Sequence, residues 1–252
     1  MNKFFLVALS SFLFIASCSQ FGENPSGDHL EEIKKSPNYD IEINRFKNRI
    51  ENMWEQISER DSFWDNPSKR ISNNYFFNSA ETVPENKLPE VKPPNIKEFM
   101  KSTESIKFIW FGHSSLLVNI KNTIILVDPV FSKAASPVSF LVKRFQPPVL
   151  ELKDLPRIDY VLISHDHYDH LDMETVIFFK EKDVKFITPL GVTSHLKSWD
   201  IDRSKLFEAD WWGTLEFEGI TFICTPAQHF SGRLATFSGF KTLWASWIVK
   251  TE

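Results

Sequence analysis

One nine-residue stretch constrains this chain more than any other feature of its sequence. Residues 164–172 read Ser-His-Asp-His-Tyr-Asp-His-Leu-Asp. They follow the apolar, strand-like residues 158–164 and precede the helical pattern of residues 173–182. At such a junction the chain leaves the edge of a sheet, and its side chains can converge on one point. Histidine and aspartate bind metal ions, so the stretch predicts a metal site where a strand ends and a helix begins.

The spacing within this stretch assigns its ligands to two cations. His165 and His167 are two residues apart, so in an extended turn both side chains can face one cation. Asp169 and His170 lie at the entrance to the helix and can face a second cation close by. Neutral imidazole and carboxylate ligands suit Zn²⁺. Asp172 is expected to cap the helix, but a cap uses one side chain and leaves three histidines unexplained.

A tetrahedral catalytic zinc takes three protein ligands and keeps one position open. His229 is the preferred third ligand, because it also follows directly after a β-prone run. His195, inside a helical pattern where surface or capping roles are common, and His113, in a tight turn, are its rivals. His113 is equally expected to be structural or to line the site. We expect Asp128, at the end of a β-prone run, to accept the free ring N–H of a ligand histidine, or to be an ordinary turn carboxylate.

The pattern of residues 105–252 predicts a mixed α/β sheet domain, with hairpins first and a strand–helix–strand unit in the middle. The expected strands cover residues 106–111, 115–120, 123–127, 158–164, 184–188, 206–209, 214–217, 220–225 and 243–249, and the expected helices cover residues 173–182 and 191–199.

The N-terminus predicts export. Residues 4–15 form an apolar run that is too short to span a bilayer but suits a signal peptide. The following Ile15-Ala16-Ser17-Cys18 resembles the bacterial lipobox, which implies a signal peptide of residues 1–17 and lipid anchoring at Cys18. We therefore expect a membrane-anchored protein of the bacterial cell envelope, on the outer membrane in a Gram-negative host. An ordinary secretory signal is the alternative.

The residues between this signal and the domain divide into two parts. Residues 18–40 are expected to form a flexible tether, and residues 41–104 a helix followed by an extended wrap around the domain. The helix is predicted from apolar residues at three- and four-residue steps, which would dock on the domain or lie on a membrane surface. These residues are Ile43, Phe46, Ile50, Met53, Trp54 and Ile57.

Charge and cysteine content exclude two classes of protein. The formal net charge is −4, with 29 basic and 33 acidic residues, so no nucleic-acid partner is expected. Two cysteines exclude a disulfide scaffold, and Cys224, within an apolar run, is expected to be an inert buried thiol. The sequence does not define an oligomeric state.

Residues 165–170 match the His-x-His-x-Asp-His signature of the metallo-β-lactamase superfamily. Further segments resemble the branch that contains N-acyl-phosphatidylethanolamine-hydrolysing phospholipase D and its bacterial relatives. They are residues 110–114, 128–132, 144–148, 225–233 and 243–247. The resemblance implies an α/β fold of the metallo-β-lactamase-like αββα sandwich type. It also implies one zinc held by His165, His167 and His229, with Asp169 and His170 contributing to a second.

The resemblance also implies ligands that are missing from this sequence. In the family, a later aspartate bridges the two metals and a later histidine completes the second site. No histidine follows His229, and the only later acid is Glu252. We therefore expect a C-terminally truncated member, with only the N-terminal part of the sandwich and an incomplete second site.

The function expected from the resemblance is a zinc-dependent hydrolase, most simply a phosphodiesterase of phospholipase D type acting on a lipid or small phosphodiester. A lactonase, another metallo-hydrolase of the superfamily or a non-catalytic zinc-binding lipoprotein are the alternatives. Asp166 and Asp169 are the candidate catalytic residues, and Asp166 would be an acid behind the metal ligands or only a hydrogen-bonding residue of the loop. Trp211, Trp212, Phe230 and the helix of Trp54 would line an apolar substrate groove or belong to the core.

Overall fold

The computed structural model describes residues 19–50, 84–86, 88, 93–102, 104–139, 142–233 and 239–251. The predicted signal peptide, the anchor residue Cys18 and the segment around Trp54 lie outside these residues. Within the described part, no helix is both long and apolar enough to cross a membrane.

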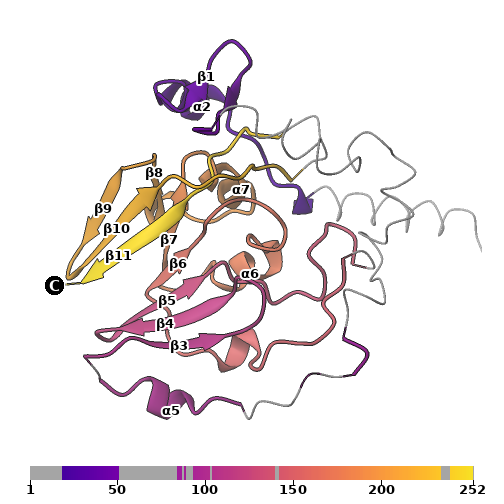
Figure 1. Cartoon of the computed structure of the whole chain (residues 1–252), viewed down its shortest axis with the longest axis vertical. Coiled ribbons are helices and arrows are strands. Elements are labelled where there is room, and N and C mark those ends of the chain that lie inside the picture. Colours follow the sequence, from indigo (N-terminus) through magenta and orange to yellow (C-terminus); the bar gives the residue numbers. More distant parts are fainter. Residues whose placement is uncertain are drawn as a thin grey trace, which may run out of the picture.

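A six-stranded mixed sheet forms the centre of the domain (Figure 1). Its first three strands pair antiparallel and its last four pair parallel. In order across the sheet they are β3 (Lys107–Trp110), β4 (Leu116–Ile120), β5 (Thr123–Val127), β6 (Tyr160–Leu162), β7 (Lys185–Pro189) and β8 (Leu206–Ala209). The strand patterns are confirmed, and the central strands read as apolar runs because both faces of the sheet are covered.

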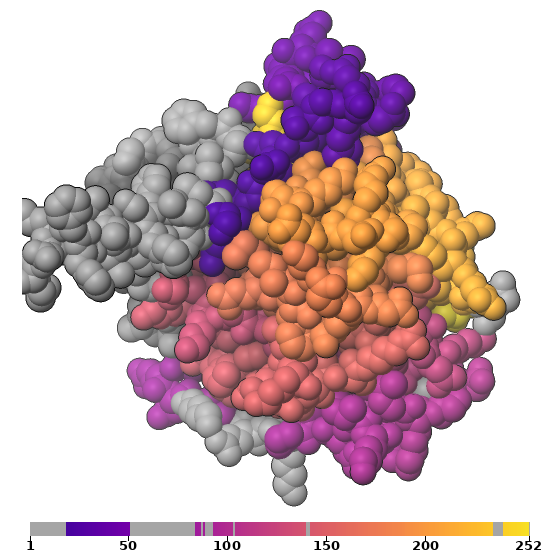
Figure 2. Space-filling model, turned by 180° about the vertical axis from the view of Figure 1, so that it is seen from behind, coloured from indigo at the N-terminus to yellow at the C-terminus, as the bar shows by residue number. Residues whose placement is uncertain are grey.

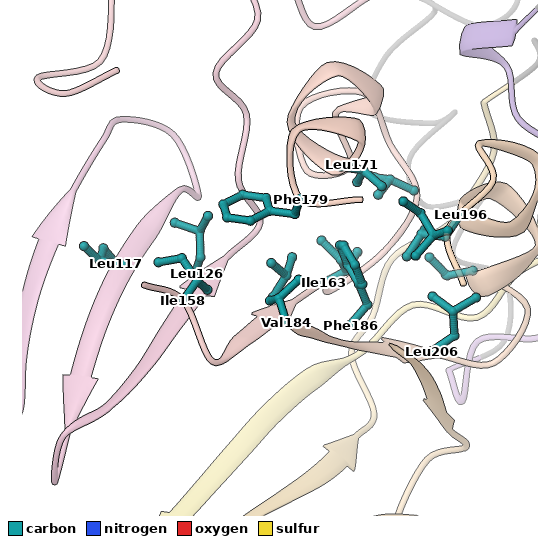
Figure 3. Packing of buried hydrophobic residues seen from close by; sticks show 14 of the residues in the cluster. Leu117, Leu126, Ile158, Ile163, Leu171, Phe179, Val184, Phe186, Leu196 and Leu206 are labelled. Atoms are coloured by element: carbon teal, nitrogen blue, oxygen red, sulfur yellow. The ribbon is translucent and has the colours of Figure 1, made fainter. Parts of the chain in front are cut away.

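Alternate residues of these strands enter two different cores. Val161 and Phe186 belong to the core on the side of α6 (Met173–Phe178) and α7 (Thr193–Ser198). Figure 3 shows Phe186 together with Phe179 and Leu196, which come from the helical side. Tyr160, Leu162 and Ile187 face the opposite way and join a second cluster.

A three-stranded antiparallel sheet covers that opposite face (Figure 1). It contains β9 (Thr214–Phe217), β10 (Ile220–Thr225) and β11 (Ser246–Thr251), with β10 in the middle. Ile220 and Phe222 of β10 pack against the six-stranded sheet. The described part therefore has three layers, helices on a sheet on a sheet, as expected for the N-terminal part of an αββα sandwich.

The N-terminal segment differs from its prediction. It contains α2 (Gly27–Ile33), β1 (Tyr39–Asp40) and β2 (Arg45–Phe46), with the two strands paired antiparallel. Ile33, Tyr39 and Phe46 are buried in one cluster with Trp211 and Trp244. The flexible tether predicted for residues 18–40 is therefore wrong over residues 19–40, because these apolar side chains dock on the domain (Figure 2).

The helix predicted from Ile43 is also wrong over residues 43–50. The chain turns at Asn44, which has a φ of +55°, and the backbone N–H of Phe46 donates to Phe240 O at 2.8 Å. Of the apolar stripe, Phe46 is buried whereas Ile43 and Ile50 are exposed. Over the described residues 43–50, the three- to four-residue spacing thus occurs without a helix.

Among the described residues of the segment 41–104, the part predicted to wrap around the domain includes a helical turn, α5 (Ile96–Phe99). The side chain of Asn95 caps this turn by accepting from Glu98 N, and Phe99 is buried in the main core. The buried aromatic ring fixes this part of the segment to the domain. The extended conformation predicted here is therefore wrong at residues 96–99, which form a helical turn.

Candidate metal centre

The loop of residues 163–172 joins β6 to α6, and Asp172 anchors its far end. The Asp172 carboxylate caps α6 by accepting from Glu174 N, and it also accepts from Phe131 N and Ser132 N at 3.0 and 2.9 Å. The predicted cap is confirmed. Because the same carboxylate holds the loop that follows β5, it fixes the two loops relative to each other.

Three histidines converge at the start of this loop. His165 Nε2 lies 2.9 Å from His167 Nδ1 and 3.0 Å from His229 Nε2, and His229 arrives from the end of β10. The three ligand atoms lie within 4.8 Å of one another. The structure thus brings together the three residues that the sequence grouped around one cation.

The electrostatics of these rings fit a metal site. Burial and the neighbouring imidazoles lower the pKa of His165 to about 2 and that of His229 to about 4, and burial also lowers the pKa of His167. All three rings are therefore neutral at neutral pH and offer lone pairs. A tetrahedral ion bound at about 2.0–2.1 Å holds its ligand nitrogens about 3.3 Å apart, so only small outward shifts are needed.

Asp128 takes the position expected of a residue behind the ligands. Its Oδ2 lies 2.8 Å from His170 Nδ1, and the carboxylate also accepts from Ser164 N at 2.7 Å and Ser164 Oγ at 2.6 Å. Ser164 Oγ lies 2.9 Å from His165 Nδ1. With Nδ1 of His170 held in this way, its Nε2 is left for a cation, since such contacts fix the tautomer of a ligand histidine.

A second group of potential ligands lies beside the first. His113 Nε2 is 2.9 Å from Asp169 Oδ2, and His170 Nε2 is 3.7 Å from the same oxygen. The hydrogen bond from His113 holds the pKa of Asp169 below its usual range although burial opposes this, and the same bond raises the pKa of His113. The structure thus places His113, a sequence candidate for the third ligand of the first cation, beside Asp169 and His170 instead.

Asp166 points away from both groups. Its side chain is enclosed, with 1% of the residue exposed, and accepts from Gly232 N at 2.7 Å, Thr242 Oγ1 at 2.7 Å and His195 Nε2 at 3.1 Å. Burial opposes its ionisation, but the hydrogen bond from His195 leads the contacts that hold its pKa below the usual range. The structure therefore corrects the interpretation of Asp166 as a catalytic acid in favour of a hydrogen-bonding residue of the loop.

His195 is buried rather than on the surface. It is 2% exposed in α7, and its Nδ1 has no hydrogen-bond partner among the described residues. Gly22 packs against this ring so closely that a Cβ there would lie 2.5 Å from Nδ1. His195 is thus excluded as a rival of His229 for the metal, because its free nitrogen faces Gly22 and its other nitrogen faces Asp166.

Two residues that support the site had no assigned role in the sequence. The buried Arg233 guanidinium donates to Asp166 O at 2.9 Å and to Leu171 O at 2.7 Å. It therefore connects the two ends of the loop of residues 163–172, which carries the candidate ligands. Asn48 Nδ2 donates to His229 O at 2.7 Å, and Asn48 Oδ1 accepts from His229 N at 3.1 Å. The distance of Asn48 from His229 in the chain leaves no local signal for this pairing.

The aromatic residues that were expected to line a substrate groove or belong to the core differ in position. Trp211 is buried in the cluster with Trp244, Trp212 is 63% exposed, and the Phe230 ring lies 4.5 Å from the ring of His167. Phe230 therefore is the aromatic residue of the three that contacts a candidate ligand. Cys224 is a free, buried cysteine, as predicted, and burial raises the pKa of its thiol.

Comparison with known proteins gives matches in the same region. A family model described as a beta-lactamase superfamily domain matches residues 123–252. An uncharacterized protein of Mycobacterium tuberculosis is 42% identical over 156 residues, which are 61% of this chain and 41% of that protein. N-acyl-phosphatidylethanolamine-hydrolyzing phospholipase D 1 of Caenorhabditis elegans is 37% identical over 153 residues, covering 57% of this chain and 43% of that protein.

A solved metallo hydrolase from Ignicoccus hospitalis is 20% identical, with a TM-score of 0.44, and the match covers 58% of this chain and 56% of that one. The chain spans about two fifths of the length of the two curated relatives, 41% and 43%.

Proposed function

Since the chain belongs to the beta-lactamase superfamily, whose model matches just over half of its 252 residues, we propose that it is a zinc-dependent hydrolase of phospholipase D type. The observation that carries this proposal is the convergence of His165, His167 and His229 as neutral rings on one point. Neutral imidazoles can hydrogen-bond to one another in pairs, but three of them turned toward one point also form the ligand set of a tetrahedral zinc site.

The residues around this point have distinct tasks in the proposed reaction. A bound Zn²⁺ would polarise a phosphoryl or carbonyl oxygen and lower the pKa of a water molecule. The three histidines fix its position, and Arg233 and Asn48 hold the backbone that carries them. Preorganised ligands of this kind let the metal act without rearranging the loop, because their supporting contacts are already made.

The proposed substrate is a lipid phosphodiester of the N-acyl-phosphatidylethanolamine kind. Support comes from the name of the Caenorhabditis elegans relative and from the position of Phe230 against His167. Apolar side chains beside a metal centre favour substrates with an apolar portion, since pockets bury most of the ligand surface. Lipid anchoring at Cys18 in the bacterial cell envelope, also a proposal, would keep the site next to such substrates.

The test combines metal content with activity. The purified chain is expected to contain zinc and to release a phosphatidate-like product from vesicles that contain N-acyl-phosphatidylethanolamine. His165→Ala should lose both, whereas His29→Gln, a histidine outside both groups, should keep both. Hydrolysis of lactones but not of the lipid would overturn the substrate. A zinc content no higher than that of a control protein would overturn the hydrolase itself.

A further inference from the structure

We propose that the chain carries a second hydrolytic site, separate from the metal centre, in which the hydroxyl of Ser194 attacks small carboxylic esters. Its three side chains come from elements that are distant in the sequence, with His29 in α2, Ser194 in α7 and Glu208 in β8. The N-terminal segment lies against the part of the chain that contains α7 and β8 (Figure 2). The site uses none of the candidate metal ligands, so it goes beyond the proposed function and does not depend on it.

Two hydrogen bonds join these side chains in the order of a catalytic triad. Ser194 Oγ lies 2.9 Å from His29 Nδ1, and His29 Nε2 lies 2.8 Å from Glu208 Oε2. A serine, a histidine and a carboxylate connected in this order recur on unrelated folds as nucleophile, base and orienting group. Such a triad is recognised by its geometry rather than by the order of its residues in the sequence. Here the histidine turns Nδ1 toward the serine and Nε2 toward the carboxylate.

Glu208 determines which ring nitrogen of His29 carries the proton. An ionised carboxylate only accepts hydrogen bonds, so Nε2 donates to Glu208 and Nδ1 of the neutral ring keeps its lone pair. The Ser194 hydroxyl therefore donates to Nδ1, which is the arrangement in which a histidine can remove the proton of a nucleophile. Glu208 is itself held in place, because its Oε1 accepts from Thr193 N at 2.8 Å.

Lys197 adds a positive charge beside this hydroxyl. Ser194 and Lys197 are three residues apart in α7, so they are neighbours on the helix, and Lys197 Nζ lies 3.5 Å from His29 Nδ1. A cation in this position stabilises the negative charge that develops on a carbonyl oxygen during attack, and its effect is larger where water is excluded.

The exposure of the three side chains limits the size of the substrate. Ser194 is 8% exposed, and the side chains of His29 and Glu208 are 20% and 13% exposed. The group is therefore shielded from bulk water but still opens to solvent. This shielding favours an ester with a small acyl group.

The proposed reaction has two halves. Ser194 Oγ forms a bond to the carbonyl carbon of the ester, and its proton moves to His29 Nδ1. The bond between that carbon and the leaving alcohol then breaks, and the alcohol takes the proton from Nδ1, which leaves an acyl group on Ser194. Water repeats the two steps, releases the carboxylic acid and restores the hydroxyl.

The test measures the reactivity of Ser194, because contacts that only dock α2 on the domain leave a serine unreactive. The full chain is treated with a fluorophosphonate, whose phosphorus an activated serine attacks with loss of fluoride. Peptide mass spectrometry is expected to locate the label on Ser194. Hydrolysis of p-nitrophenyl acetate, measured in parallel, should decrease in Ser194→Ala.

Two variants test the roles of His29 and Glu208. His29→Gln removes the base, so the labelling rate should fall by at least about 100-fold. Glu208→Gln keeps an oxygen for Thr193 N but turns an NH₂ group toward His29 Nε2, which moves the ring proton to Nδ1. Ser194 can then no longer donate to Nδ1, and the labelling rate should fall to a similar extent.

Ser198→Ala is the matched control. Ser198 lies on the same helix, but its hydroxyl donates to a backbone carbonyl, His195 O, at 2.7 Å. This variant should be labelled at the wild-type rate. His165→Ala should also keep the label while it loses zinc, whereas His29→Gln should lose the label while it keeps zinc.

The outcomes separate this site from the proposed function. A label on Ser194 that is lost in His29→Gln or Glu208→Gln, at an unchanged melting temperature, supports the site. The absence of a label on Ser194 in the wild type would overturn it, and so would labelling of either variant at the wild-type rate. A labelled chain that does not hydrolyse the lipid would refute only the proposed function.

Discussion

Replacing Asp166 with asparagine is expected to destabilise the fold strongly, although the two side chains have nearly the same shape. The carboxylate accepts three hydrogen bonds, from Gly232 N, Thr242 Oγ1 and His195 Nε2. An amide replaces one accepting oxygen with an NH₂ donor. If its oxygen stays with Gly232 N, the NH₂ group faces the other two donors.

The surroundings limit how far these donors can adapt. The Thr242 hydroxyl can rotate and accept, but it then gives up its own bond. His195 can accept at Nε2 only by moving its proton to Nδ1, which has no hydrogen-bond partner among the described residues. An unpaired buried donor costs about 1–3 kcal/mol, and a lost bond to a charged group about 1.5–3 kcal/mol. Asp166→Asn should therefore cost about 2–5 kcal/mol in free energy of unfolding.

The measurement is urea unfolding of the metal-free chain, followed by tryptophan fluorescence. Asp169→Asn is the matched control, because Asp169 belongs to the same loop and its side chain is 44% exposed. It should cost less than about 1 kcal/mol. If Asp166→Asn were no more destabilising than Asp169→Asn, the assignment of Asp166 as a structural acceptor would be refuted.

Two other predictions follow from the contacts around the site. Asn48→Ala removes both side-chain hydrogen bonds to the backbone of His229, so zinc affinity measured against a chromophoric chelator should fall by about 10- to 100-fold; an unchanged affinity would contradict this role. Burial lowers the pKa of His195, so below about pH 6.5 the unfolded chain binds a proton that the folded chain does not. Folding stability should therefore decrease as the pH falls, by up to about 1.4 kcal/mol per pH unit from this group. His195→Gln should show a smaller slope in urea titrations at several pH values, and an identical slope would exclude this cause.

Local sequence patterns predicted the sheet and most of the candidate ligands. The central strands are short apolar runs, and β8, β9 and β10 begin and end at the predicted residues. His165, His167, Asp169 and His170 lie within six residues, so their proximity needs no tertiary information. His229 could be added because it also follows directly after a strand.

The residue roles that the sequence did not reveal depend on contacts between segments distant in the chain. His113 joins the second group through a strained turn that brings its ring to Asp169, and spacing cannot show this. The stripe of Ile43, Phe46 and Ile50 has helical spacing, yet only Phe46 is buried, because it lies in β2, which pairs with β1 and donates a backbone hydrogen bond to Phe240 O. The spacing of apolar residues alone cannot distinguish a buried helix face from a segment in which a single apolar residue of the stripe is buried.

The N-terminal segment of residues 19–50 therefore belongs to the metal domain rather than forming a flexible tether. Its first residues contact the side chains that support the histidine loop and α7. Gln20 O accepts from Arg233 Nη2 at 2.8 Å, and Ser19 O accepts from Trp199 Nε1 at 2.7 Å. Its middle is held by Ser36, whose hydroxyl donates to Asp210 Oδ2 at 2.7 Å. Arg233 is a buried cation, and a buried cation without its acceptors is strongly destabilising. The loop that carries the histidines thus depends on residues that precede it by more than a hundred positions, and residues 105–252 do not form a complete structural unit without them.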